Sequence, residues 1–301
     1  MKGAYLAPFF MLHSFITYLS VEKRYSEHTI GAYERDLLQF IDYAEIKEVK
    51  NFGDLSSTFI RGWIVHLFEQ QIKAKSINRK LAALRTYYKW LRKELIVTVN
   101  PMSKIQGPKN EKRLPAFAKE SELDSSNLNE LYADSLEGIR DKLMVELFYQ
   151  TGIRLSELIE LRVQNVTNES IKVLGKRNKE RIIPISSELA KQLNSFIHLK
   201  NRSYGESAYV FSLKFGKKLY PMFVYRKINQ YLSMATSLDK KSPHVLRHTF
   251  ATHMLNRGAG LETLKDLLGH ANLSATQVYT HNSFAQLTSI YSQTHPRGGK
   301  K

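Results

Sequence analysis

Cysteine is absent from this chain of 301 residues. The absence excludes a disulfide framework, a thiol nucleophile and a zinc site built on cysteines, and it fits the reducing cytoplasm. Internal repeats, low-complexity tracts and a carboxylate cluster suited to a two-metal nuclease site are also lacking. The length predicts two domains of ordinary size, each able to bury its own hydrophobic core.

Long apolar runs are lacking except near the N-terminus. Residues 3–21 follow a lysine and are largely apolar, as in a signal peptide, but Pro8, His13 and the lack of a small-x-small cleavage site argue against one. The stretch is also marginal in length and too polar for a membrane span. Its larger apolar side chains have the i, i+3, i+4, i+7 spacing of an amphipathic helix: Leu12, Phe15, Ile16 and Leu19. We therefore expect a packed first helix.

Acidic side chains are few compared with basic ones. The chain has 28 Asp and Glu against 45 Lys and Arg, a formal net charge of +17 and a pI near 9.8. Residues 1–110 hold 17 basic and 10 acidic side chains, and residues 111–301 hold the remaining 28 and 18. Both halves are therefore basic, and nucleic acid is the simplest polyanionic partner. A basic surface that is merely solvated is the alternative.

The first hundred residues are expected to form helices, because further segments have apolar side chains at helical spacing. In residues 26–45 they are Ile30, Tyr33, Leu37, Phe40, Ile41 and Ala44. In residues 56–71 they are Ile60, Trp63, Ile64, Leu67 and Phe68. Ser57 is the expected N-cap of this second helix.

Residues 75–94 predict a basic helix. Its expected buried stripe consists of Ile77, Leu81, Leu84, Tyr88 and Leu91. The basic side chains that cluster elsewhere on this helix are Arg79, Lys80, Arg85, Lys89, Arg92 and Lys93, and the segment has a single acidic residue, Glu94. Such a helix can lie in a DNA major groove or along its phosphates, although a charged solvent-facing surface is the alternative. The candidate DNA-binding residues are Arg79, Lys80, Arg85 and Lys89.

A proline ends this helix and a polar segment follows. Asn100 and Pro101 stop the helix, and residues 105–117 contain a glycine, two prolines and three basic side chains. This composition predicts an exposed linker at residues 106–115. We expect a helical domain of residues 1–105 and a second domain of residues 116–301.

The second half of the chain predicts a mixture of helices and strands. Helices are expected at residues 139–149, 155–161, 222–236 and 244–256, with short helices after Gly258 and Gly260. Residues 170–187 consist of two β-rich runs joined by a polar turn, which predicts a hairpin. A further strand is expected at residues 209–213.

The most informative pattern lies near the C-terminus. His244 and Arg247 occur in PHVLRHTFATH, and Tyr279 lies nine residues after His270 in LLGHANLSATQVYTH. A phosphodiester under attack gathers negative charge on its non-bridging oxygens, and fixed arginines stabilise that charge without reorganisation. Arg154 and Arg247 are our candidates for a clamp on both oxygens.

A tyrosine nucleophile needs help, because with a pKa of about 10 only about one tyrosine in a thousand is ionised at pH 7. A cationic surrounding and a nearby histidine lower that cost, and a lysine on a hairpin can protonate the leaving 5′-oxygen. No metal or cofactor is needed for this chemistry. The alternative for His244 and His248 is a zinc site, but HVLRH lacks the glutamate of H-E-x-x-H.

Taken in order, these motifs resemble the tyrosine recombinase (integrase) family, and most closely its bacterial Xer-type site-specific recombinases. The matching segments are SEHTIGAYERDL, SINRKLAALRTYYKWL, NPM, TGIRLSELIEL, VLGKRNKERIIPI, PHVLRHTFATHML, LKDLLGHANLSATQVYTH and THPR. The resemblance assigns as catalytic Arg154, Lys176, His244, Arg247, His270 and the nucleophile Tyr279. Glu157 would orient Arg154, and Lys179 and Arg181 could compete with Lys176 for the role of general acid.

The resemblance also implies a fold and partners. The expected fold is mainly α with a small β-sheet: a C-shaped DNA clamp with a helical SAM-like core-binding domain and a mixed α+β catalytic domain. Residues 284–301 would be the segment exchanged between protomers. The expected partners are a double-stranded recombination site, a homo- or hetero-tetramer with itself or a paralogue, and a septal DNA translocase; no membrane, metal or cofactor is expected.

The implied reaction forms a 3′-phosphotyrosyl bond and a Holliday junction, with chromosome-dimer resolution as its usual task. Three alternatives remain open from the sequence. They are a transposon- or phage-encoded integrase of the same family, a type IB topoisomerase, and a DNA-binding protein without catalysis.

Overall fold

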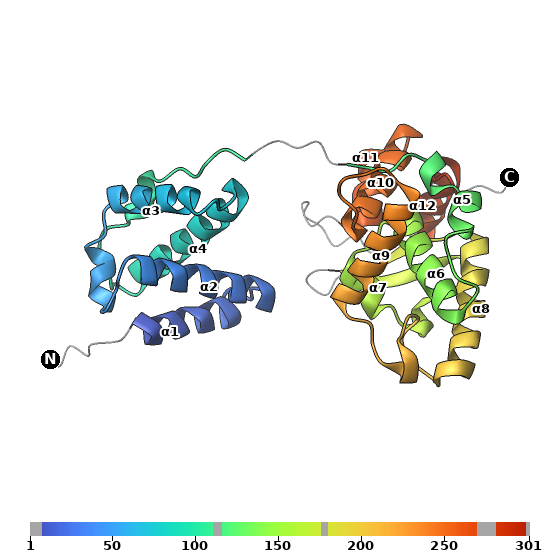
Figure 1. The fold of residues 1–301 in the computed structure, drawn as a ribbon, viewed down its shortest axis with the longest axis horizontal. Helices are drawn as coiled ribbons and strands as arrows, with labels where there is room; N and C mark the ends of the chain where they lie inside the picture. Colours follow the sequence, from blue (N-terminus) through green and yellow to red (C-terminus); the bar gives the residue numbers. More distant parts are fainter. Residues whose placement is uncertain (1–7, 111–115, 176–179, 270–280, 299–301) are drawn as a thin grey trace. The chain divides into compact units, whose positions relative to one another are not determined.

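The computed structural model describes residues 8–110, 116–175, 180–269 and 281–298. Contacts within the chain divide it into two compact units, Met1–Arg113 and Leu114–Lys301, which are described separately. Helices predominate in both, and the described ranges contain one two-stranded sheet (Figure 1). The expected fold class, mainly α with a small β-sheet, is therefore confirmed.

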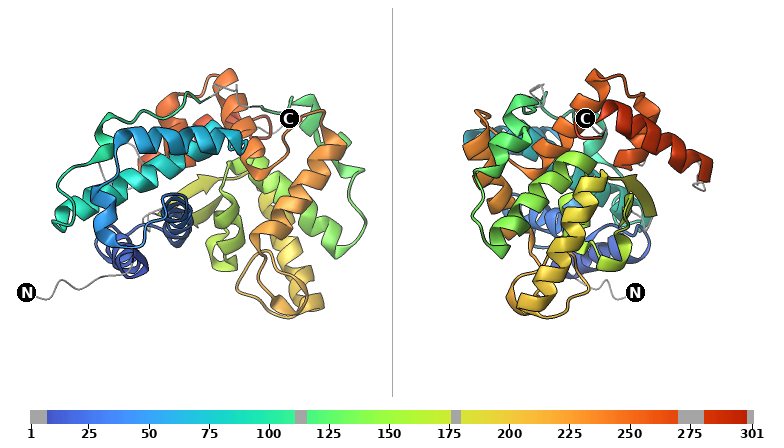
Figure 2. Two further views of the ribbon diagram at one scale, coloured as in Figure 1. Left: turned by 60° about the vertical axis from the view of Figure 1, so that its left-hand side comes forward. Right: turned by 90° about the vertical axis from the view of Figure 1, so that its right-hand side faces the viewer.

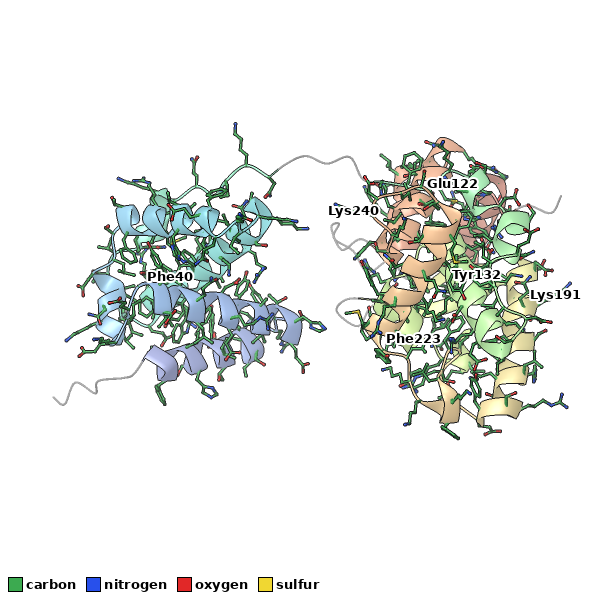
Figure 3. All side chains as sticks on the ribbon, viewed as in Figure 1. Phe40, Glu122, Tyr132, Lys191, Phe223 and Lys240 are labelled. Carbon is green, nitrogen blue, oxygen red and sulfur yellow. The ribbon has the colours of Figure 1, made fainter. Side chains whose placement is uncertain are left out.

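The first unit consists of helices connected by short turns (Figure 1). They are α1 (Pro8–Val21), α2 (Glu27–Tyr43), η1 (Val49–Gly53), α3 (Ser57–Glu69), α4 (Ala74–Lys93) and η2 (Pro101–Lys104). The packed first helix is confirmed, because Phe15 of α1 is fully buried and its ring centroid lies 4.9 Å from that of Tyr87 in α4. Phe40 of α2 points into the same core (Figure 3), and its ring centroid lies 4.7 Å from that of Trp63 in α3.

The expected stripe of α4 is confirmed, since all five of its members are buried. Two details of α3 were wrong. Ser56, not Ser57, is the N-cap: its Oγ accepts a hydrogen bond from the backbone of Phe59 at 3.1 Å, whereas Ser57 Oγ donates to the carbonyl of Pro101 at 2.7 Å. Phe68 is 48% exposed, because only the other apolar face of α3 contacts the core.

The second unit surrounds a buried helix with further helices and a hairpin (Figure 1). Its helices are η3 (Ser121–Leu123), α5 (Ser125–Asn129), α6 (Leu136–Thr151), α7 (Leu155–Glu160), η4 (Val163–Asn165), α8 (Ser187–Tyr204), η6 (Lys214–Gly216), α9 (Pro221–Ala235), α10 (Pro243–Asn256), α11 (Leu261–Leu268) and α12 (His281–Thr294). The expected hairpin is confirmed: β1 (Ser170–Leu174) pairs antiparallel with β2 (Glu180–Pro184), with Ile171 opposite Ile183. Figure 2 shows α12 along one flank of this unit, where it contacts α10 and α11.

Helix α6 is the centre of the second unit. It packs against α8 and α10, and nearly all of its residues from Gly138 onward are buried. It ends as expected at Gly152, which has the left-handed φ of 58°. A Cβ on Gly152 would lie 2.6 Å from Phe250 Cδ1, so only glycine fits this turn against α10.

Near the start of the second unit, Ala118 is hydrogen-bonded to side chains of α10. The backbone N–H of Ala118 donates to Thr249 Oγ1 at 3.0 Å, and its carbonyl is 2.9 Å from His253 Nε2. His253 Nδ1 in turn lies 3.0 Å from the hydroxyl of Tyr149 on α6. Burial lowers the pKa of His253, which keeps this hydrogen-bonded link in its neutral form.

Two parts of the second unit differ from the sequence-based prediction. Residues 209–213 form only isolated bridges, Arg162 with Tyr209 and Ser212 with Lys218, because no neighbouring chain runs alongside them far enough to make a ladder. No element was expected at residues 188–204, but α8 spans them, with Ser186 as its N-cap. Among the described helices, none is both long and apolar enough to cross a lipid bilayer.

Candidate active site

Helix α10 carries two of the predicted catalytic residues. Pro243 occupies its first turn, His244 follows and is exposed, and Arg247 lies one turn later and is buried. The guanidinium of Arg247 donates to the carbonyl of Gly152 at 2.5 Å and to that of Leu268 at 2.7 Å. Burial lowers the pKa of Arg247 to about 10, with the charges of two neighbouring arginines acting in the same direction. The side chain therefore remains charged at neutral pH.

Arg154 stands at the N-terminus of α7, where Glu157 holds it at two points. The backbone N–H of Arg154 donates to Glu157 Oε2 at 2.7 Å, and its Nη1 donates to Oε1 at 2.8 Å. Its Nη2 reaches the carbonyl of Gly269 at 3.0 Å. Arg154 thus has a defined orientation while part of its side chain stays accessible to solvent.

Glu157 is shared between two arginines. It is almost fully buried, and both of its oxygens accept hydrogen bonds from Arg181 at 2.8 Å, in addition to those from Arg154. Burial alone would raise the pKa of this carboxyl. The hydrogen bonds and charge of Arg181, together with the bonds from Arg154, instead hold the pKa of Glu157 at about 2. The carboxylate is therefore ionised throughout the physiological range.

Arg181 lies on β2 with its side chain only 4% exposed. Besides its two bonds to Glu157, its Nε donates to the carbonyl of Leu267 at 2.8 Å. A guanidinium that is buried and bonded in this way does not release a proton to a leaving group. The other two general-acid candidates on the predicted hairpin, Lys176 and Lys179, lie outside the described residues.

The C-terminal end of α11 gathers three arginines that are far apart in the sequence. The carbonyls of Leu267, Leu268 and Gly269 accept hydrogen bonds from Arg181, Arg247 and Arg154 respectively. The last carbonyls of a helix have no partner within the helix and carry its negative dipole end, so cations are favoured there. Gly269 itself adopts a φ of 63°, and a Cβ on it would lie 3.2 Å from Arg181.

The cluster carries more positive than negative charge. Arg154, Arg181 and Arg247 contribute three positive charges and Glu157 contributes one negative charge. The helix end offsets this excess only in part, because it supplies roughly half an elementary charge. An anion such as a phosphate would therefore be favoured beside the guanidinium groups of Arg154 and Arg247, the two members of the predicted clamp.

The remaining predicted catalytic residues, His270 and Tyr279, lie outside the described residues, as does Lys176. The structure thus brings Arg154 and Arg247 together and places His244 on the same helix as Arg247. The role of Arg181 did not emerge from the sequence. One signal was available: the strand alternation puts Arg181 on the same side of β2 as the buried Ile183.

The candidate DNA-binding residues of α4 differ in their exposure and in the contacts that they make within the protein. Arg79 and Lys80 both form ion pairs with the buried Asp36, and the Lys80 side chain is only 11% exposed. Arg85 donates to the carbonyl of Ile105 at 2.9 Å, whereas Lys89 is exposed. Arg79 and Lys89 are thus the more accessible members of this set. Within the described ranges, no group of three or more His, Asp or Glu side chains could hold a metal ion.

Comparison with known proteins identifies the class to which this fold and site belong. The sequence model described as "Phage integrase family" matches residues 121–286, and that of the "Phage integrase, N-terminal SAM-like domain" matches residues 12–95. The chain belongs to the phage integrase family of tyrosine recombinases, as its motifs indicated. It is an enzyme of the tyrosine site-specific recombinase class.

Among the relatives of this chain are proteins named tyrosine recombinase XerC. The one from Anoxybacillus flavithermus is 36% identical over 96% of this chain and 98% of its own length, and the one from Halalkalibacterium halodurans is 37% identical over 94% and 96%. The solved structure of the XerH recombinase bound to its difH substrate, a post-cleavage complex, has a similar fold. It has a TM-score of 0.72 and 20% identity, and the match covers 93% of this chain and 83% of that one.

Proposed function

We propose that this recombinase cleaves and rejoins DNA through a 3′-phosphotyrosyl intermediate and a Holliday junction, and that it resolves chromosome dimers during segregation. The observation that carries the chemical part is the arginine cluster. Arg154 and Arg247 come from different helices and meet on successive carbonyls of one turn, and that turn leads directly to His270. The chromosomal task is supported by the similarity to XerC proteins over nearly the whole chain.

Each residue of the proposed site has a defined task. Tyr279 attacks the scissile phosphorus, and Arg154 and Arg247 bind the non-bridging oxygens as their negative charge grows. Lys176 protonates the leaving 5′-oxygen, while His244 and His270 handle the tyrosine proton and the phosphate. The 5′-hydroxyl of the partner strand then attacks the phosphotyrosine and releases Tyr279. The number of phosphoester bonds is unchanged, so the cycle needs no energy-rich cofactor and no metal.

The assembly proposed for this reaction has four protomers on two duplex sites. They are copies of this chain alone or with a paralogue, they act in the cytoplasm where the DNA lies, and a septal DNA translocase activates them. Residues 1–105 form the core-binding domain, residues 106–115 the linker and residues 116–301 the catalytic domain. Residues 284–301 would pass to a neighbouring protomer. In the isolated chain Tyr291 and His295 of this segment are buried against α6, so exchange requires their release.

The proposal is tested with a nicked suicide duplex that carries a candidate chromosomal dimer-resolution site. After incubation, a denaturing gel separates free DNA from a covalent protein–DNA adduct. We expect an adduct with the wild-type protein and with the control variant Tyr25→Phe, which changes an exposed tyrosine of the first unit. We expect none with Tyr279→Phe, which should still retard the DNA on a native gel.

Three outcomes would contradict the proposal, and the first is the absence of an adduct with the wild-type protein. An adduct with Tyr279→Phe would remove the nucleophile assignment. Relaxation of supercoiled plasmids that lack the site would indicate a type IB topoisomerase instead, because a site-specific recombinase acts on its own sequence.

A further inference from the structure

The proposed reaction leaves one buried charge of the arginine cluster, that of Arg181, without a task. Arg181 is fully engaged, with both terminal nitrogens on Glu157 and its Nε on the carbonyl of Leu267. It also forms the surface against which Gly269 packs, since a Cβ there would lie 3.2 Å from its guanidinium. Arg181 therefore joins β2 to two elements of the active site, the start of α7 and the end of α11.

The partner that matters most is Glu157, because it also binds Arg154. A planar guanidinium and a carboxylate make their strongest pair when two parallel hydrogen bonds form. In the structure Arg181 occupies both oxygens in this way, and the side chain of Arg154 makes a single bond to Oε1. Arg154 is thus oriented by Glu157 without being fully paired to it.

Removal of Arg181 would change this balance. Glu157 would remain buried and ionised with Arg154 as its only cation in the cluster, and a buried carboxylate without adequate partners is costly. The favourable response is for Arg154 to turn and form the paired geometry itself. Its guanidinium would then face Glu157 instead of a phosphate, and its bond to the carbonyl of Gly269 would be lost.

We infer that Arg181 is a positioning residue for strand cleavage, which occupies Glu157 so that the guanidinium of Arg154 stays directed toward the scissile phosphate. The inference rests on the proposed function, because it concerns the same reaction. It differs from a general-acid role for Arg181, since the buried side chain acts on the phosphate-binding arginine, Arg154, and not on the leaving oxygen. It also differs from a purely structural role, because it predicts that removal of Glu157 compensates for loss of Arg181.

The first experiment compares single-turnover cleavage of the suicide duplex by wild type, Arg181→Met and Arg181→Lys. Lys172→Met is the matched control, because Lys172 is a cation on the adjacent strand in an exposed ion pair with Glu180. Arg181→Met should cleave about a hundredfold more slowly, the scale expected for a misplaced catalytic group. Arg181→Lys should show a smaller loss. Affinity for DNA should change by less than about threefold in both Arg181 variants, because Arg181 is buried and neutralises no surface phosphate.

The second experiment separates positioning from other roles. The double variant Glu157→Gln/Arg181→Met should cleave at least about tenfold faster than Arg181→Met, because the neutral amide cannot hold Arg154 as an ion pair. A duplex with sulfur in place of the bridging 5′-oxygen should not restore cleavage by Arg181→Met, since a thiolate leaves without a proton and bypasses only the general acid.

The outcomes are distinguishable. Wild-type rates in Arg181→Met, rescue by the sulfur substrate, or a double variant slower than the single one would each overturn the inference. If Arg181→Met does not fold, as judged by circular dichroism, the folded Arg181→Lys variant decides the question by the same criteria. No adduct with the wild-type protein would instead refute the proposed function itself.

Discussion

The most direct test of the arginine cluster is the replacement Glu157→Gln, studied through stability and not through activity. Glu157 is the only carboxylate that these arginines contact in the described residues, and its oxygens accept four hydrogen bonds from Arg154 and Arg181. The amide of glutamine has the same shape, but it has one acceptor oxygen, and its NH₂ group would face donors. The substitution therefore removes the charge with little change in volume.

The expected magnitude follows from the pKa of Glu157. Its value of about 2 in the folded protein compares with an ordinary 4.5, a difference of about 2.5 units. At about 1.4 kcal/mol per unit, ionised Glu157 contributes on the order of 3 kcal/mol to the stability of the second unit. Because the folded pKa is lowered, this contribution is fully present above pH 4.5 and is lost as the pH falls toward 2. Glu157→Gln should thus cost about 3 kcal/mol at pH 7, and the difference from wild type should shrink below pH 4.5.

The chain contains an internal control for this measurement. Its two tryptophans, Trp63 and Trp90, both lie in the first unit. In urea unfolding, tryptophan fluorescence therefore reports the first unit alone, while far-UV circular dichroism reports both. We expect the fluorescence midpoint of Glu157→Gln to equal that of wild type, and the remaining dichroism transition to move to lower urea. Equal dichroism transitions at pH 7, or a difference that persists unchanged at pH 3, would refute the reasoning.

Three further substitutions test individual contacts by urea unfolding, and an unchanged midpoint would contradict each one. Leu95 follows α4 with a φ of 58° and is 89% exposed, so Leu95→Gly should raise the fluorescence midpoint and stabilise the first unit by about 0.5–1 kcal/mol. Gly152→Ala should lower the dichroism midpoint and destabilise the second unit by about 1–3 kcal/mol, because its Cβ would overlap Phe250 at 2.6 Å. Tyr149→Phe should cost the second unit about 1–3 kcal/mol, since it leaves His253 Nδ1 buried without its partner at 3.0 Å.

Much of the architecture could be predicted from local patterns in the sequence. The buried stripe of α4, the end of α6 at Gly152 and the β1–β2 hairpin all followed from spacing or turn residues within a few positions of one another. The family also followed from ordered motifs. Helix α8 had the same kind of signal, a capping serine at Ser186 and apolar residues at helical spacing, and could have been predicted.

The sequence by itself determined where most helices run and supplied the motifs from which the catalytic residues are proposed, because periodicity, caps and motifs involve residues close together in the chain. Only the tertiary structure decided the partners of the charges. Lys80 pairs with Asp36, 44 residues away. Arg181 binds Glu157, 24 residues away, and the carbonyl of Leu267 at the end of α11, 86 residues away. Such contacts depend on how whole helices and strands pack against one another. Strand alternation places Arg181 on the buried side of β2, but no local pattern names Glu157 and the end of α11 as its partners, because they come from other parts of the chain.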